Sequence, residues 1–228
     1  MIRLFLTAAL EVVCASAVAQ TFQNIDFGLT HVPNATPWGT QVLVSEAFPF
    51  WATYFGVLPT ISVGYNGVPG ADGGIALITP DDTSDEGIPG HNTAFLQAGS
   101  GNFGLVSVAL AQTAQFPAGT MSLLFVATPP NGGGWQVSVG GQTIPVVEVS
   151  QVDTRFNEYE ANISAFAGLT EELRFTALPG TSGANMWLGE IQFSPMEMPE
   201  PSTLALVGLG FVGILVLRRP TWPKHNGA

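Results

Sequence analysis

The sequence predicts an all-β domain, an antiparallel sandwich or barrel, between two terminal apolar segments. Short runs rich in Val, Ile, Phe and Thr recur between Gly, Pro, Ser and Thr turns about every ten residues. Apolar and polar residues alternate in Trp135–Val139 and Leu173–Ala177, as in strands with one buried face. Before residue 198 no long stretch has the helical period of 3.6 residues.

The candidate strands follow one another closely enough for a single domain, residues 20–196, with no linker long enough to divide it. Glycine pairs and triplets at 131–134 and 140–141 indicate hairpin turns, and Ile163–Leu169 indicates one helical turn. In chain order the candidate strands are Phe22–Phe27, Thr60–Tyr65, Gly74–Thr79, Thr93–Gln97, Leu105–Thr113, Thr120–Ala127, Trp135–Val139, Thr143–Val149, Phe156–Ile163, Glu172–Ala177 and Met186–Phe193.

The N-terminal segment, residues 1–19, has the order of a secretory signal peptide. Arg3 supplies a positive charge, residues 4–13 are mostly apolar, and Ala17-Val18-Ala19 has the small-x-small form of a cleavage site. Cleavage after Ala19 would leave Gln20 as the first residue. We therefore expect an exported protein.

The C-terminal segment contains a predicted single transmembrane helix, residues 203–217. Its uncharged run 204–217 would be roughly 21 Å long as a helix, which is short against a bilayer core of ~30 Å. Arg218 and Arg219 follow at once, and positive residues remain on the cytoplasmic side. The preceding domain would then lie on the opposite side of the membrane from the two arginines. A buried core helix is the alternative, but such a helix would normally be amphipathic.

Pro199-Glu200-Pro201 precedes this apolar run, so that a Pro/Glu motif, a hydrophobic stretch and a basic cluster occur in one order. Residues 197–228 thereby resemble the PEP-CTERM sorting tail of exported Gram-negative bacterial proteins. The resemblance implies an exosortase-like membrane peptidase as a partner, an inner-membrane intermediate anchored by the helix, and final delivery to the cell surface or the extracellular space.

Composition excludes several classes of function. Cys14, the only cysteine, lies in the predicted signal, so the mature domain would have no disulfide, thiolate nucleophile or cysteine-based metal site. Residues 20–198 contain 15 acidic residues and only two basic ones, Arg155 and Arg174, which gives a net charge of −13. Because this field repels phosphate backbones, nucleic acid is not an expected partner.

The second half of the domain resembles the carbohydrate-binding-module-like jelly rolls of bacterial surface proteins. The resemblance rests on Ala111–Thr120, on Asn162–Gly168 followed by Glu172–Thr176, and on the closing strand Met186–Phe193. It implies an antiparallel jelly-roll-like β-sandwich. In the closing strand the family's acidic pair is reduced to Gly189-Glu190, which weakens the case for a metal site there.

Aromatic side chains are the candidates for a sugar-binding face. We assign Trp38, Trp51 and Tyr54 to it, because the two tryptophans flank a proline-containing apolar stretch and an exposed ring can stack on a sugar. Trp135 and Trp187 lie within strand patterns, which favours the core for both.

Calcium is the one candidate ion, since it prefers six to eight oxygen ligands. Related sandwiches pair an N-terminal acid with one on the last strand, which here would be Asp26 and Glu190. The acidic run 81–86 is better explained as a solvated loop. No other cofactor is expected.

The leading hypothesis is an exported, non-enzymatic protein of the cell surface or extracellular matrix, sorted and processed by an exosortase. A polysaccharide-binding module is the alternative, followed by a hydrolase that uses a carboxylate pair. The sequence contains no G-x-S-x-G elbow for a serine nucleophile.

Overall fold

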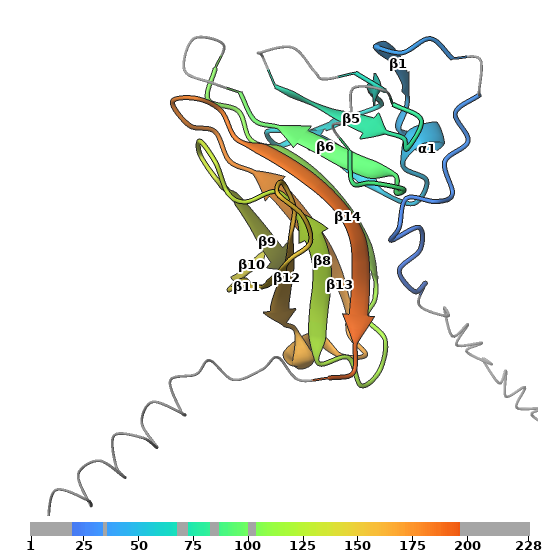
Figure 1. Ribbon diagram of the computed structural model, residues 1–228. Helices are drawn as coiled ribbons and strands as arrows, with labels where there is room; N and C mark the ends of the chain where they lie inside the picture. Colours follow the sequence, from blue (N-terminus) through green and yellow to red (C-terminus); the bar gives the residue numbers. More distant parts are fainter. Residues whose placement is uncertain (1–19, 34–35, 68–72, 83–86, 100–103, 197–228) are drawn as a thin grey trace, which may run out of the picture.

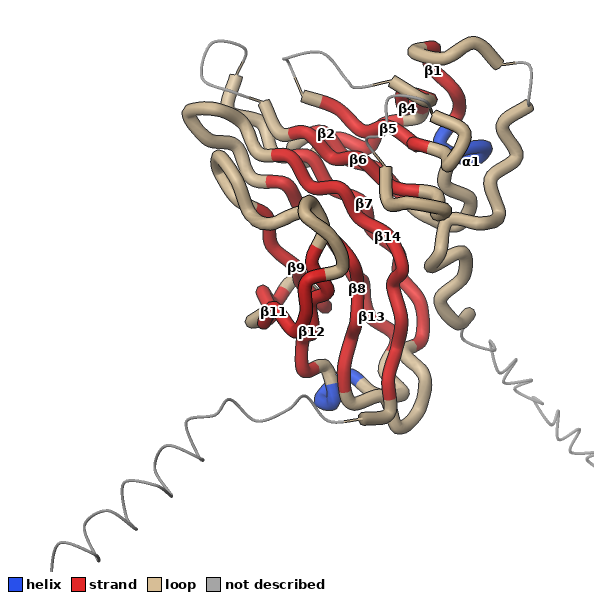
Figure 2. Tube along the Cα trace, in the orientation of Figure 1, coloured by secondary structure: helices blue, strands red, loops and turns tan. Residues whose placement is uncertain are grey.

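The computed structural model describes residues 20–33, 36–67, 73–82, 87–99 and 104–196. The predicted signal peptide and sorting tail therefore lie outside the described residues. Two β-sheets stack face to face, and the helices among the described residues are one turn of α-helix, α1 (Val44–Ala47), and a 3-10 turn, η1 (Ser164–Phe166) (Figure 2). This confirms the predicted all-β class.

The larger sheet has eight strands. In spatial order they are β1 (Thr40–Leu43), β4 (Ser62–Tyr65), β5 (Gly74–Ile78), β6 (Thr93–Gln97), β14 (Asn185–Ser194), β8 (Ser122–Ala127), β12 (Asn157–Asn162) and β11 (Val147–Gln151). Neighbouring strands run antiparallel except β4 and β5, which pair in parallel through Gly64 and Tyr65.

The second sheet has six strands, all paired antiparallel. In spatial order they are β10 (Gln142–Ile144), β9 (Trp135–Val139), β13 (Thr170–Ala177), β7 (Val108–Gln115), β2 (Ala52–Phe55) and β3 (Leu58–Thr60). The long strand β14, orange in Figure 1, curves along the length of the domain and ends beside the last described residues. There Ser122 Oγ donates a hydrogen bond of 3.0 Å to the carbonyl oxygen of Met196.

The main core fills the space between the sheets, because alternate residues of each strand point inward. Phe95, Phe125 and Phe175 are each fully buried, but only the last two belong to this core. Phe95 lies in a smaller cluster with Ala76 and Ile78, on the outer face of the larger sheet. A third cluster on the same face joins Ile88, Val126 and Phe156.

The structure corrects two predicted strands. Residues 22–27 form a turn and not a strand, with left-handed backbone at Asn24 (φ 53°) and Phe27 (φ 55°) and a single bridge at Thr21. The predicted strand Thr143–Val149 is two strands, β10 and β11, which belong to different sheets. Pro145 separates them, since it can donate no ladder hydrogen bond.

Candidate functional site

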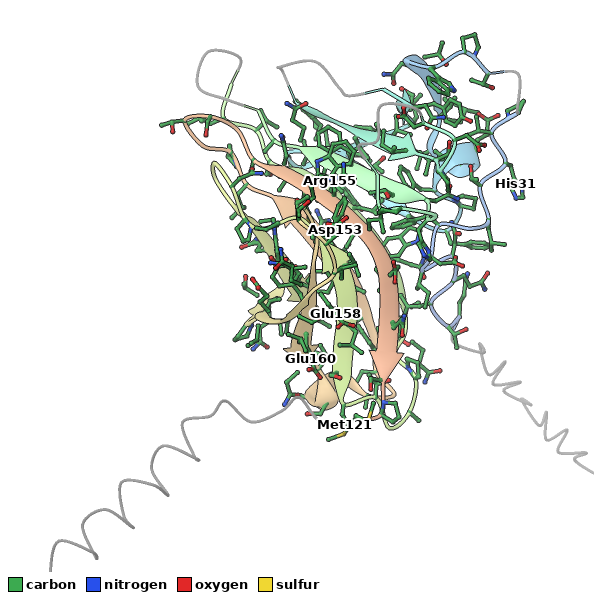
Figure 3. The ribbon with its side chains drawn as sticks, in the orientation of Figure 1. His31, Met121, Asp153, Arg155, Glu158 and Glu160 are labelled. Atoms are coloured by element: carbon green, nitrogen blue, oxygen red, sulfur yellow. The ribbon has the colours of Figure 1, made fainter. Side chains whose placement is uncertain are left out.

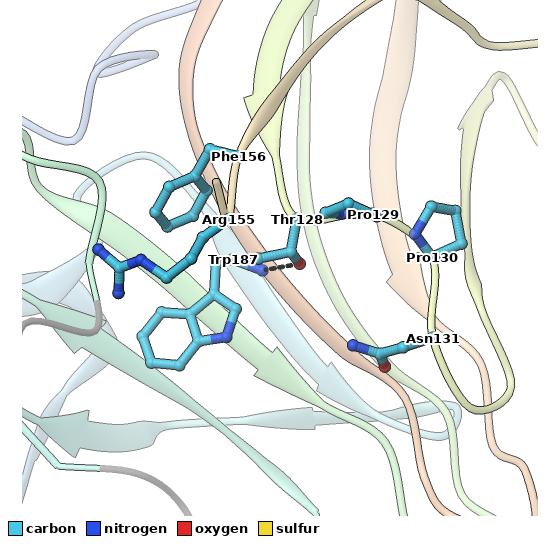
Figure 4. Close-up of a pocket in the computed structure, with 7 residues that line it drawn as sticks. All are labelled: Thr128, Pro129, Pro130, Asn131, Arg155, Phe156 and Trp187. Carbon is cyan, nitrogen blue, oxygen red and sulfur yellow. Dashed lines mark hydrogen bonds between the residues drawn. The ribbon is translucent and has the colours of Figure 1, made fainter. Parts of the chain in front are cut away.

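A hollow of about 450 Å³ opens on the outer face of the larger sheet, beside the start of β14 (Figure 4). Its volume lies within the range of small-ligand sites. It lies between the loop that joins β8 to β9 and the loop that precedes β12. The residues that line it are Thr128, Pro129, Pro130, Asn131, Arg155, Phe156 and Trp187.

Trp187 reaches this hollow because the alternation of β14 places Met186 and Leu188 in the core and Trp187 on the opposite face. Its ring stacks on Phe95, with centroids 4.1 Å apart and planes at 34°. The predicted core role of Trp187 is confirmed only in part, since it packs against the two small clusters on this outer face and not in the main core. The two-residue period of a strand could have predicted this position. Because Met186 and Leu188 are both apolar and point to the core, the residue between them must point to the opposite face.

The indole N–H of Trp187 has no hydrogen-bond partner among the described residues. The bonds of Trp187 come from its backbone: its N–H donates to Thr128 Oγ1 at 3.3 Å, and its carbonyl oxygen accepts the Thr128 N–H at 3.2 Å. In Figure 4 the indole nitrogen lies on the edge of the ring that faces Asn131. One donor is thus available to a ligand in the hollow.

Asn131 offers a second donor. Its Oδ1 accepts a hydrogen bond of 2.9 Å from the backbone N–H of Asn185, which fixes the orientation of the amide. The amide Nδ2 then faces the hollow (Figure 4). The loop that joins β8 to β9 packs closely against the loop that joins β13 to β14. A Cβ atom at Gly132 would overlap the carbonyl oxygen of Gly183. Glycine is required there both for this contact and for φ 54°.

Arg155 forms the opposite rim. Asp153 Oδ1 accepts the backbone N–H groups of Arg155 and Phe156 at 2.7 and 2.8 Å, which shapes the turn before β12. The guanidinium lies over the Phe156 ring, 5.1 Å from its centroid, and Nη2 donates to the Gly87 carbonyl oxygen at 3.4 Å. Figure 3 places Asp153 and Arg155 at this end of β12, with Glu158 and Glu160 further along toward Met121.

The predicted sugar-binding aromatics do not form one face. Trp51 is only 5% exposed, packs in the main core and donates its indole N–H to the Asn24 carbonyl oxygen at 2.9 Å, so its ring is not exposed for stacking on a sugar as predicted. Tyr54 lies on the outer face of the six-stranded sheet, where the Arg174 guanidinium covers its ring at 4.2 Å. Trp38 is 48% exposed, in the turn before β1.

The predicted core role of Trp135 agrees with its place in the structure. Its ring lies edge-on to Phe125 and Tyr159, at centroid distances of 5.8 and 4.9 Å, and its Nε1 donates to the Thr128 carbonyl oxygen at 3.0 Å. This bond connects the core to the floor of the hollow.

Asp26 and Glu190 line a second hollow of about 540 Å³, together with His91. His91 Nε2 lies 3.5 Å from Glu190 Oε1, and Gly28 N–H donates to Asp26 Oδ1 at 3.0 Å. Among the residues that the structure describes, no three His, Cys, Asp or Glu side chains are grouped so that they could hold a metal ion. The calcium site stays a prediction.

No helix in the described parts of the chain is both long and apolar enough to cross a bilayer. The predicted span 203–217 and the motif residues Pro199, Glu200, Pro201, Arg218 and Arg219 lie in the part that is not described.

Comparison with known proteins gives one sequence match and two structural ones. No curated protein matches significantly. A carbohydrate-binding module, TmCBM61, solved in complex with β-1,4-galactotriose, has a TM-score of 0.41 and 13% identity, covering 77% of this chain and 97% of that one. The K1 cleaved adhesin domain of Lys-gingipain from Porphyromonas gingivalis W83 has a TM-score of 0.38 and 13% identity, covering 68% and 96%. In sequence, residues 199–219 match the PEP-CTERM protein-sorting motif, so the C-terminal segment of this chain carries that sorting motif.

Proposed function

We propose that this chain is an exported, non-enzymatic protein of the cell surface or extracellular matrix in a Gram-negative bacterium. A jelly-roll-like sandwich is flanked by a signal peptide and a transmembrane helix, and an exosortase-like peptidase recognises the tail. The observation that carries the proposal is the sorting motif at residues 199–219. The localisation and the processing rest on it.

The chemistry of the tail supports the order of events. Proline at 199 and 201 keeps the motif extended and outside the helix, and Glu200 adds a charge at the edge of the apolar run. Arg218 and Arg219 oppose transfer of the tail through the membrane. The last described residue, Met196, lies beside β8 and three positions before the motif. A peptidase at the membrane would therefore meet a short segment and not the folded sandwich.

The test is the intact mass and cell fraction of the chain in a host that carries an exosortase. We expect a product that lacks residues up to about 19 and beyond about 199, outside the inner membrane. Glu200→Ala and Pro201→Ala should accumulate full-length protein in the inner membrane. Glu197→Ala, a matched removal of a nearby carboxylate outside the motif, should be processed normally. Normal release of both motif variants would contradict the proposal.

Polysaccharide recognition is a second candidate, and the hollow beside Trp187 favours it. A half-buried indole with an unbonded N–H stands among proline and phenylalanine rings, a surface suited to the apolar face of a sugar. The described residues that line the hollow include no Asp or Glu, so this site offers no carboxylate pair for glycoside cleavage. Binding without cleavage is the better explanation of this site.

A further inference from the structure

We infer that the hollow beside Trp187 binds one ring of a neutral saccharide, held by nitrogen donors on one side and apolar rings around it. The inference rests on the proposed polysaccharide recognition and adds the site and the ligand class. Unlike the three aromatics singled out in the sequence, the residues of this hollow already lie around one volume of about 450 Å³.

The donors indicate what the ligand must supply. The Trp187 indole N–H and the Asn131 amide Nδ2 both face the hollow (Figure 4). Each of these nitrogens donates hydrogen bonds and accepts none, so the ligand must supply acceptors. Hydroxyl and ring oxygens of a sugar are matching acceptors. Thr128 Oγ1 is already bonded to the Trp187 backbone N–H at 3.3 Å and to the Asn185 carbonyl oxygen at 3.4 Å, so it serves the frame of the site.

The apolar walls indicate a ring with a C–H face. Pro129, Pro130 and Phe156 line the hollow around the indole, while Phe95, the cross-strand neighbour of Trp187 on β6, stacks on it from the same outer face of the sheet. This support keeps the Trp187 ring in one orientation before a ligand arrives, which lowers the entropic cost of binding. The bonds of Asn131 to Asn185 and of Asp153 to the Arg155 turn hold both rims in the same way.

Charge selects a neutral ligand over an acidic one. The domain carries a net charge of −13 over residues 20–198, which repels polyanions at a distance. Arg155, the cation among the described residues that line the hollow, already bonds the Gly87 carbonyl oxygen and lies over the Phe156 ring. It therefore acts as part of the wall.

The experiment measures retardation of the full chain in native gels that contain dextran, galactomannan or laminarin, with alginate and polygalacturonate as acidic counterparts. A detergent without a sugar headgroup keeps the apolar tail soluble. We expect retardation by at least one neutral polymer and by neither acidic one. Trp187→Phe keeps the stack on Phe95 and removes the N–H, and should weaken binding about three- to tenfold.

Asn131→Asp keeps the Oδ1 acceptor for Asn185 and replaces the inward donor with an oxygen, so it should weaken binding at least about tenfold. Asn162→Asp, the same exchange at an exposed asparagine outside the hollow whose Oδ1 accepts the Ser164 N–H, is the control and should bind as the parent does. Thermal unfolding of each variant checks that it is folded.

Three other results would contradict the inference in different ways. Neutral binding that is unchanged in both hollow variants would overturn the site and leave polysaccharide recognition standing. Retardation by the acidic polymers alone would overturn the ligand class. If none of the five polymers retards the parent chain, both the inference and the proposed recognition fail.

Discussion

At the scale of single residues, the surroundings of a tryptophan decide its role. Trp51 and Trp38 both border the apolar stretch that suggested a ligand face, yet one is 5% exposed and the other 48%. Trp51 packs edge-on against Phe27, with centroids 5.7 Å apart, and its N–H bonds the Asn24 carbonyl oxygen. Trp51 is therefore a structural residue.

We expect Trp51→Ala to lower the free energy of unfolding by about 3–5 kcal/mol, because it opens a cavity and removes one of the two hydrogen bonds to the Asn24 carbonyl oxygen, which also accepts the Phe27 N–H at 3.2 Å. Trp38→Ala, the matched surface change, should remain within about 0.5 kcal/mol of the parent. Urea unfolding followed by circular dichroism measures both. Similar stability of the two variants would contradict the buried assignment of Trp51.

Tyr159 gives a prediction for alkaline pH. Burial, and secondarily the carboxylate of Glu148, raises the pKa of the Tyr159 hydroxyl above its ordinary value of 10.0, while the Asn157 side chain opposes the rise. The hydroxyl oxygen has no partner with hydrogen-bond geometry among the described residues. Because the folded pKa is the higher one, this contribution to stability is complete below pH 10.0 and is lost as pH rises through the folded value.

Tyr159→Phe should therefore be nearly as stable as the parent at pH 8 and should lose less stability than the parent between about pH 10 and pH 11. Urea unfolding at these pH values tests the difference. Tyr65→Phe, at another buried tyrosine, is the matched control for the loss of a phenol. An equal alkaline loss in the parent and in Tyr159→Phe would contradict the predicted effect of burial.

At the scale of elements, β14 combines regular pairing with one irregularity. Its register against β8 shifts between Gly189 and Gln192, and Glu190 within this bulge has a left-handed φ of 49°. Left-handed backbone costs roughly 1–2 kcal/mol for a residue with a Cβ atom. Glycine does not pay this cost.

We expect Glu190→Gly to be more stable than Glu190→Ala by about 1 kcal/mol, the reverse of their order at an ordinary strand position. Both variants lose the same carboxylate and its contact with His91, so the comparison isolates the backbone. Chemical denaturation of the pair measures it. An alanine variant at least as stable as the glycine variant would contradict the strained backbone.

The same variants test the predicted calcium ligand. Calcium requires six to eight oxygen ligands, and in the described part of the chain Asp26 and Glu190 are the acidic side chains of this hollow. If Asp26 and Glu190 hold calcium, millimolar calcium should raise the melting temperature of the parent more than that of Glu190→Ala. An equal rise in the two proteins would contradict the predicted site.

The sequence predicts an element well when the residues of that element alone determine its structure, and poorly when distant residues do. Trp135–Val139 and Thr93–Gln97 have the predicted bounds, because alternation and flanking turns are contained in the segment itself. Residues 22–27 have the composition of a strand, but the turn they form is held by contacts with residues 27 and 89 positions away, from Asn24 to Trp51 and from Gln23 to Gln112. The hollow beside Trp187 was not predicted because it requires two loops and strand β14, which are distant in the sequence, to meet.

At the scale of the whole molecule, two features are arranged along β14. Trp187 lies near its start, and the last described residues lie beyond its end, seven residues or about 23 Å from Trp187 to Ser194 at ~3.3 Å per residue. A chain held by its C-terminal segment would therefore keep the start of β14 away from the attachment, because the attachment follows the other end of that strand (Figure 1). This arrangement is compatible with the proposed binding of material outside the cell.

The net charge of −13 over residues 20–198 acts on the whole molecule. It should make the stability of the fold depend on salt, but not the affinity for a neutral ligand. Repulsion among like charges weakens the compact state and is screened by salt. Raising NaCl from about 10 to 200 mM at pH 7 should therefore raise the melting temperature by roughly 2–4 °C, equivalent to about 1 kcal/mol. The double variant Glu148→Gln, Glu158→Gln should show a smaller rise.

Affinity for a neutral saccharide should not change over the same salt range, because its contacts are hydrogen bonds and apolar packing. A steep loss of that affinity with salt would contradict a contact made of hydrogen bonds and apolar packing alone.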